Sequence, residues 1–126
     1  MTRPLLLLLC LAAAALPAGC GADEPGGAGT ASARGGRVAI RMTDFRYTPQ
    51  AIRARPGRLR LDISNHGRLA HTLWVSRRNG NVAKADSLLP GEKTAKTLKV
   101  RTGEYRFFCA LSNHEELGMY GTLVVK

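Results

Sequence analysis

The chain has 126 residues, enough for at most one small domain. It carries 19 Lys and Arg against nine Asp and Glu, a formal net charge of +10. These basic residues recur along the chain instead of forming one block, so a basic arm that binds nucleic acid is not indicated. The charge favours contact with anionic lipid headgroups or with an acidic protein partner. A basic surface that is simply solvated explains it equally well.

The N-terminus has the pattern of an export signal. Arg3 precedes an apolar run over residues 5–16, and Pro17 and two small residues follow it. This run is shorter than the roughly 20 residues that a membrane-spanning helix needs. We therefore predict a signal peptide over residues 1–19, and an exported protein, in preference to a permanent membrane anchor.

Cys20 follows the small residues Ala18 and Gly19, and this arrangement resembles the lipobox of bacterial lipoproteins, although Pro17 stands where a branched apolar residue is usual. The resemblance implies that Cys20 carries lipid. It would hold the protein at the outer face of the cytoplasmic membrane or in the periplasm. Plain secretion is the alternative. Residues 20–36 are rich in Gly and Ala, cannot bury a core, and are predicted to form a flexible tether.

The remaining residues, 37–126, are predicted to form one all-β domain. Apolar and polar residues alternate with the period of a half-buried strand, most clearly at Leu59, Leu61 and Ile63. The segment 82–89 is ambiguous between a helical turn and an irregular edge strand. About seven to eight short strands, with turn signals roughly every ten residues, indicate a β-sandwich.

Four side chains of this domain have the chemistry of ligands for a soft metal ion. Cys109, His114 and Met119 lie within eleven residues, and His71 begins an earlier apolar strand. A thiolate, two imidazoles and a weak thioether suit copper, in a trigonal His₂Cys site with a long axial Met. Cys109 is the only cysteine of the predicted domain, and an unpaired thiol is unusual in an exported protein. His66, in a turn, is predicted to be solvated.

Strand parity points two of these side chains toward the core. His71 alternates with Leu73 and Val75, and Cys109 alternates with Phe107. Taken singly, each ligand has a purely structural explanation, because a free cysteine often serves as a small apolar core residue and a methionine as a gap filler. A histidine can be an interior hydrogen-bonded residue or a solvated loop residue. The coincidence of all four in one small domain favours a metal site.

The domain resembles the cupredoxins, the small blue copper proteins of the plastocyanin and azurin kind. The residues that carry this resemblance are 45–49 with Ile52, 56–57, 65–67 with His71, 103–109, His114 and 118–125. The resemblance implies a cupredoxin-like Greek-key β-sandwich with one mononuclear type 1 copper ion. His71, Cys109 and His114 would be the equatorial ligands, and Met119 the axial one. The Cys109-to-His114 spacing matches azurin and the His114-to-Met119 spacing matches plastocyanin, so the subgroup stays open.

The same resemblance implies a monomer that passes single electrons between redox protein partners outside the cytoplasm. His114 would be the electron port within an apolar rim of Ala110, Leu111 and Leu117, and the basic surface would suit a partner's acidic docking surface. Copper storage, delivery or resistance with the same ligands is the alternative function. An enzyme is not expected. A multicopper oxidase needs further His-x-His pairs, and the three histidines of this sequence form none. A dinuclear copper centre needs a second loop cysteine.

Overall fold

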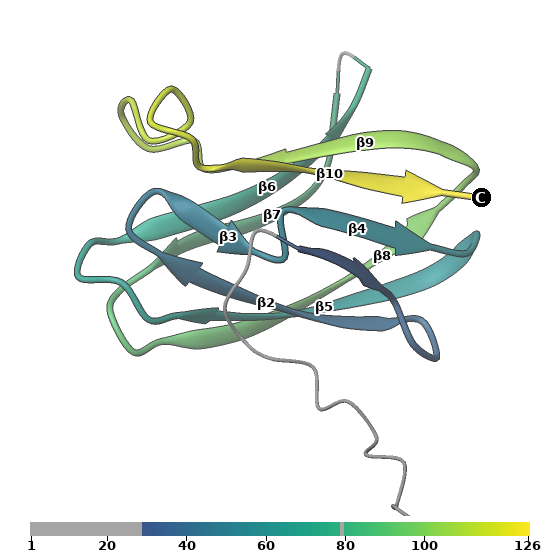
Figure 1. The fold of residues 1–126 in the computed structure, drawn as a ribbon, viewed down its shortest axis with the longest axis horizontal. Helices are drawn as coiled ribbons and strands as arrows, with labels where there is room; N and C mark the ends of the chain where they lie inside the picture. Colours follow the sequence, from purple (N-terminus) through teal and green to yellow (C-terminus); the bar gives the residue numbers. More distant parts are fainter. Residues whose placement is uncertain (1–28, 79) are drawn as a thin grey trace, which may run out of the picture.

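The computed structural model describes residues 29–78 and 80–126, and these residues form strands in two sheets that pack face to face (Figure 1). The strands are β1 (Thr30–Ser32), β2 (Arg37–Thr43), β3 (Arg46–Thr48), β4 (Ala51–Ala54), β5 (Gly57–Asn65), β6 (His71–Arg77), β7 (Gly80–Leu88), β8 (Lys93–Val100), β9 (Gly103–Phe108) and β10 (Tyr120–Val125). Within this part of the chain no helix is long and apolar enough to cross a membrane. The prediction of an all-β sandwich is confirmed.

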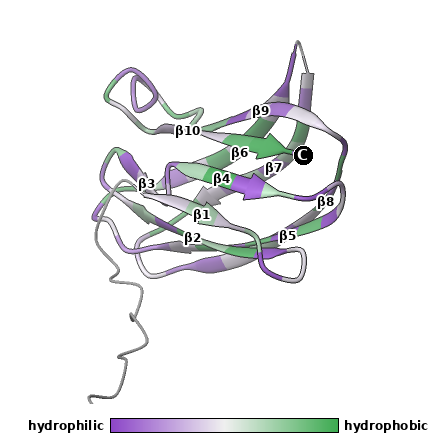
Figure 2. Ribbon diagram, turned by 45° about the vertical axis from the view of Figure 1, so that its right-hand side comes forward, coloured by the Kyte–Doolittle hydropathy of each residue, from purple (hydrophilic) through white to green (hydrophobic). Residues whose placement is uncertain are grey.

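One sheet has the strand order β1-β4-β10-β9-β6-β7, and the other has the order β3-β2-β5-β8. Hydrophobic and hydrophilic residues alternate along the strands of both sheets (Figure 2). On β5 the predicted alternation is confirmed, since Leu59, Leu61 and Ile63 are at most 2% exposed while Arg58 and Arg60 face solvent. The core between the sheets is made by these side chains and their counterparts on the other strands.

The strand count exceeds the seven to eight predicted, for three local reasons. β1 lies inside residues 20–36, the predicted tether, and pairs in parallel with β4 at an edge of the larger sheet. Residues 30–32 are therefore part of the larger sheet and not of a tether, because an existing sheet edge can order even a Gly- and Ala-rich segment through backbone hydrogen bonds. The predicted signal peptide, residues 20–28 of the predicted tether and the lipidation of Cys20 fall on residues outside the described ranges.

The other two differences concern β3, β4 and β7. The chain from Arg46 to Ala54 changes sheets, so β3 pairs with β2 in the smaller sheet while β4 pairs with β10 in the larger one. Residues 82–88 of the ambiguous segment 82–89 belong to β7, an edge strand that pairs with β6 through two register shifts. Such bulges interrupt the period of two, which explains why the sequence pattern was ambiguous there.

The arrangement of β6, β9 and β10 brings distant parts of the sequence to one end of the sandwich. β9 is antiparallel to both neighbours, with Phe108 opposite Trp74 of β6 and opposite Tyr120 of β10. The start of β6, the end of β9 and the start of β10 therefore lie together. The loop over residues 109–119 connects β9 to β10 at this end, at the upper left in Figure 1.

Gly121 offers a test of the packing beneath that loop. Gly121 lies on β10, opposite Phe107 of β9. A Cβ atom at position 121 would overlap the Phe107 ring and the carbonyl oxygen of Gln50. We expect Gly121→Ala to lower the free energy of unfolding by about 1–3 kcal/mol, measured by chemical denaturation. Gly80→Ala is the matched control, because a Cβ at that position meets nothing within 4 Å. Equal stability of the two variants would contradict the packing described.

Candidate metal centre

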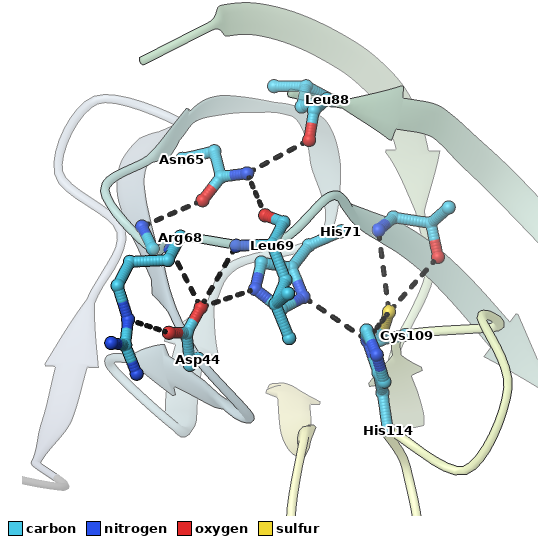
Figure 3. Close-up of polar contacts among 10 residues, drawn as sticks. Asp44, Asn65, Arg68, Leu69, His71, Leu88, Cys109 and His114 are labelled. Atoms are coloured by element: carbon cyan, nitrogen blue, oxygen red, sulfur yellow. Dashed lines mark hydrogen bonds and ion pairs between the residues drawn. The ribbon is translucent and has the colours of Figure 1, made fainter. Parts of the chain in front are cut away.

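Three of the four predicted ligand side chains meet at the end of the sandwich where the 109–119 loop lies. One ligand atom each from His71, Cys109 and His114 lie within 4.8 Å of one another. The two Nδ1 atoms of the histidines are 3.3 Å apart, and Nδ1 of His114 is 3.5 Å from Sγ of Cys109. Figure 3 shows the two rings and the sulfur facing a common point. Two imidazoles and a thiol converging in this way form an arrangement that a single cation can occupy.

The ligand side chains differ in their access to water. His71, Cys109 and Met119 are at most 1% exposed, whereas His114 is only half-buried. Met119 lies at the end of the loop, where its backbone N–H donates to the carbonyl oxygen of His114 at 3.0 Å. The backbone N–H of Cys109 donates to the carbonyl oxygen of Met119, also at 3.0 Å. Both ends of the loop are therefore joined by backbone hydrogen bonds, and one imidazole reaches the surface.

The sulfur of Cys109 receives two hydrogen bonds from Thr72, the residue after His71. The Thr72 backbone N–H donates to Sγ at 3.4 Å, and the Thr72 hydroxyl donates at 3.6 Å. The same hydroxyl accepts a hydrogen bond of 2.8 Å from the backbone N–H of Ala110. The Thr72 carbonyl oxygen accepts a hydrogen bond from the buried Tyr47 hydroxyl at 2.6 Å. These contacts hold the sulfur of Cys109 in position, and the thiolate is the form of cysteine that binds metals.

His71 is held from the opposite side of its ring by Asp44, which lies between β2 and β3. Nε2 of His71 is 3.4 Å from Oδ1 of Asp44. Oδ1 also accepts hydrogen bonds from the backbone N–H groups of Arg68 and Leu69, at 2.8 and 3.3 Å. The hydrogen bond from the Arg68 backbone lowers the pKa of Asp44 to about 2, with a smaller contribution from the Arg68 side chain. Burial lowers the pKa of His71. At neutral pH the carboxylate is ionised and the imidazole is neutral, as a metal ligand must be.

Asn65 holds the loop that leads from β5 to His71. Its side-chain N–H₂ group donates to the carbonyl oxygens of Leu69 and Leu88, at 2.8 and 2.9 Å, and its Oδ1 accepts from the backbone N–H of Gly67 at 2.9 Å. Asn65 is 1% exposed, so these three bonds satisfy a polar group that would otherwise be costly to bury. The loop is thereby fixed between the two sheets.

The chain matches the family described as the cupredoxin-like domain over residues 5–125. It belongs to this family. The predicted resemblance to cupredoxins is confirmed. No curated protein matches the chain.

Solved structures share the cupredoxin fold at low sequence identity. Auracyanin from the photosynthetic bacterium Roseiflexus castenholzii superposes with a TM-score of 0.67 at 16% identity, covering 72% of this chain and 97% of that one. Auracyanin A from Chloroflexus aurantiacus, a "blue" copper protein, superposes with a TM-score of 0.61 at 15% identity, covering 72% of this chain and 100% of that one. A multicopper oxidase superposes with a TM-score of 0.58 at 22% identity, covering 71% of this chain and 41% of the oxidase. At such identities the similarity concerns the fold.

Some residues around the cupredoxin site were not found from the sequence. Asp44 and Thr72 contact His71 and Cys109, and the ring of Phe45 lies edge-on to the ring of His114, with 5.1 Å between centroids. Asp44 and Phe45 lie far from the ligands in the sequence, and no spacing rule connects them. His66 is exposed, with Nε2 at 3.0 Å from the Ser64 hydroxyl, and it is not among the grouped ligands, as predicted.

The surface around His114 has the expected apolar character in part. Leu117 is 52% exposed, Ala110 is exposed and Leu111 is half-buried. Beside this rim, Glu115 accepts a hydrogen bond from Nε of Arg106 at 2.8 Å. The half-buried imidazole thus lies in a loop whose exposed side chains are both apolar and charged.

The Thr72 hydroxyl offers a test of how the cupredoxin centre is supported without metal. Thr72→Val keeps the shape of the side chain but leaves the Ala110 N–H and the Cys109 sulfur without their hydroxyl partner. We expect the metal-free protein to lose about 1–3 kcal/mol of unfolding free energy, measured by chemical denaturation. Thr72→Ser retains the hydroxyl and is the control, which should lose less. If the two variants are equally stable, the hydroxyl has no such role.

Proposed function

We propose that this cupredoxin is an electron-transfer protein with one type 1 copper ion, bound by His71, Cys109, His114 and Met119. The observation that carries the proposal is the convergence of two imidazole nitrogens and a thiol sulfur within 4.8 Å. A copper ion bound there would supply one-electron chemistry by changing between Cu(I) and Cu(II).

The donor set fits copper better than zinc. Thiolate and imidazole ligands suit both ions, but a structural zinc site takes its fourth ligand from Cys, His or a carboxylate. In this chain the fourth candidate is Met119, which is buried at the end of the ligand loop. A thioether in that position is characteristic of type 1 copper sites.

The surrounding residues keep the ligands in place. Three of the ligands are buried, and the sulfur of Cys109 and the ring of His71 each have hydrogen-bond partners from the fold. A rigid ligand set changes little when the charge of the ion changes, which keeps reorganisation small during electron transfer. His114 is the one half-buried member of the ligand set, in a loop that also exposes Leu117, and it is the proposed port for electrons.

The protein is proposed to be a carrier rather than an oxidase. The matching multicopper oxidase is a longer chain, of which this chain covers 41%. The present sequence contains three histidines, and one of these, His66, is exposed and away from the ligands. Two ligand histidines suffice for one copper ion, and the single remaining histidine cannot hold a copper cluster by itself.

The proposed location is outside the cytoplasm, either on the outer face of the cytoplasmic membrane through lipid on Cys20, or in the periplasm. The N-terminal pattern of residues 1–20 supports this. The proposed partners are redox proteins with an acidic docking surface, because a net charge of +10 speeds encounter with acidic proteins. A monomer suits brief contacts with such partners.

Addition of Cu(II) tests the proposal directly. We expect an intense visible charge-transfer band from the Cys109 thiolate to the metal, which an optical titration would record with one copper per chain. Cys109→Ser should abolish the band, while His66→Gln should leave it unchanged because that side chain is exposed and lies outside the ligand group. Circular dichroism verifies that both variants are folded. A colourless Cu(II) complex of the unmodified protein would contradict the assignment.

A second measurement separates the carrier from a copper-delivery protein, which is the alternative function. A carrier should show a reversible redox couple and fast electron self-exchange, and should retain Cu(I) in the presence of a chelator. Rapid loss of Cu(I) to the chelator would favour delivery instead.

Met119→Leu tests the fourth ligand. Leucine has a similar volume but no electron pair to donate, so the more highly charged Cu(II) should be stabilised less. We expect the visible band to persist and the reduction potential, measured by voltammetry, to rise. An unchanged potential would show that Met119 is not a ligand.

A further inference from the structure

Asp44 approaches the metal centre from the side that faces away from Cys109. In Figure 3 its carboxylate lies on one side of the His71 ring, and His114 and Cys109 lie on the other. The contact joins Nε2 of His71 to Oδ1 of Asp44, while Nδ1 of the same ring faces His114. The ring therefore has one nitrogen directed to the ligand group and the other directed to a carboxylate.

The fold holds this carboxylate in place. Oδ1 accepts hydrogen bonds from the backbone N–H groups of Arg68 and Leu69, and Oδ2 accepts one from Nε of Arg68 at 3.2 Å. The Asp44 side chain is 22% exposed. Gly67 leaves room for it, since a Cβ atom at position 67 would come within 2.5 Å of Oδ1 and 3.1 Å of Nε2 of His71. Asp44 lies in the turn between β2 and β3, and its partners lie in the loop between β5 and β6. The contacts therefore join two loops that are distant in the sequence.

We infer that Asp44 is a positioning residue of the copper centre, which fixes the protonation of His71 at Nε2 and lowers the reduction potential of the metal through its negative charge. This inference rests on the proposed function. It goes beyond the ligand set, because Asp44 acts through His71 and does not bind the ion.

The protonation of His71 follows from hydrogen-bond chemistry. An ionised carboxylate can only accept, so the ring nitrogen that faces it must carry the proton. In a neutral imidazole the other nitrogen, Nδ1, then has a free electron pair directed toward the ligand group. A carboxylate behind a ligating histidine orients the ring and makes it a stronger donor.

The effect on the reduction potential follows from charge. Cu(II) carries one more positive charge than Cu(I), so a nearby anion and a more basic imidazole both stabilise Cu(II) more. The Arg68 guanidinium offsets part of the negative charge of Asp44, but its side chain is 94% exposed and is screened by water and salt. The Asp44 carboxylate contacts His71 directly and is much less exposed than the Arg68 side chain, so its charge is the less screened of the two.

Asp44→Asn in the full-length protein tests the charge. The amide keeps an oxygen that can accept hydrogen bonds and occupies nearly the same space. We expect the ratio of the Cu(I) to the Cu(II) binding constants to rise about tenfold, within the range typical for partners of metal ligands. A tenfold change in this ratio corresponds to a rise of about 59 mV for one electron, measured by voltammetry.

Asp62→Asn is the matched control. The Asp62 carboxylate also accepts hydrogen bonds from arginines, Arg37 and Arg60, but it lies on β5 and contacts no ligand. Its replacement should leave the potential unchanged. An unchanged potential in Asp44→Asn, or an equal shift in the control, would overturn the role of the charge.

A measurement without copper tests the positioning itself. Nitrogen-15 NMR of the metal-free protein, recorded above the pKa of His71, should show the proton on Nε2 in the unmodified protein and in Asp44→Asn. In Asp44→Ala the two tautomers should both be populated. A proton on Nδ1 in the unmodified protein would overturn the inference. Because this readout needs no metal, it remains decisive even if the protein fails to bind copper and the proposed function is wrong.

Discussion

The metal centre depends on the antiparallel pairing of β9 with both β6 and β10. This pairing places the first residue of β6, the residue after β9 and the residue before β10 at one end of the larger sheet. Those three positions are His71, Cys109 and Met119. Strand pairing fixes backbone positions to within a fraction of a residue, because a slip by one residue would turn every side chain to the other face. The buried faces of β6 and β9 oppose such a slip, so the ligand positions are as well determined as the core.

Burying the ligands requires that their polar atoms have partners. A thiol and an imidazole buried in the core without hydrogen bonds would lower the free energy of unfolding. Here Thr72 donates hydrogen bonds to the sulfur of Cys109, and Asp44 contacts the ring of His71. Asn65 holds the loop that leads to His71. The groups that satisfy the buried polar atoms are also those that fix the ligand directions. Stability and ligand geometry therefore have the same structural origin at this end of the molecule.

The fold class and the meeting of His71, Cys109 and His114 could be predicted from the sequence because both leave local signals. Period-two alternation identified β5, and the shared parity of Phe107 and Cys109 correctly placed the thiol inside. The pattern failed where backbone pairing, rather than side-chain burial, determines the structure. The small residues of β1 predict a tether, because its pairing with β4 is visible only in three dimensions. The sequence does not predict the contact of Asp44 with His71 for a similar reason, since the partners of Asp44 come from a loop more than twenty residues away.

The two histidines of the centre have different surroundings, and the difference suits different tasks. His71 is fully buried and bonded to a carboxylate that the backbone holds in place. His114 is half-buried, and its ring meets the edge of Phe45 instead of a charged group. A charged partner beside the exposed ligand would be screened by water, and it would add a desolvation cost each time a redox partner docked there. Charge can influence a bound ion more effectively through the buried ligand, whereas the half-buried His114 suits the proposed role of electron port. Asp44 and Phe45 are adjacent in the turn between β2 and β3, so one short segment of the chain supports both functions.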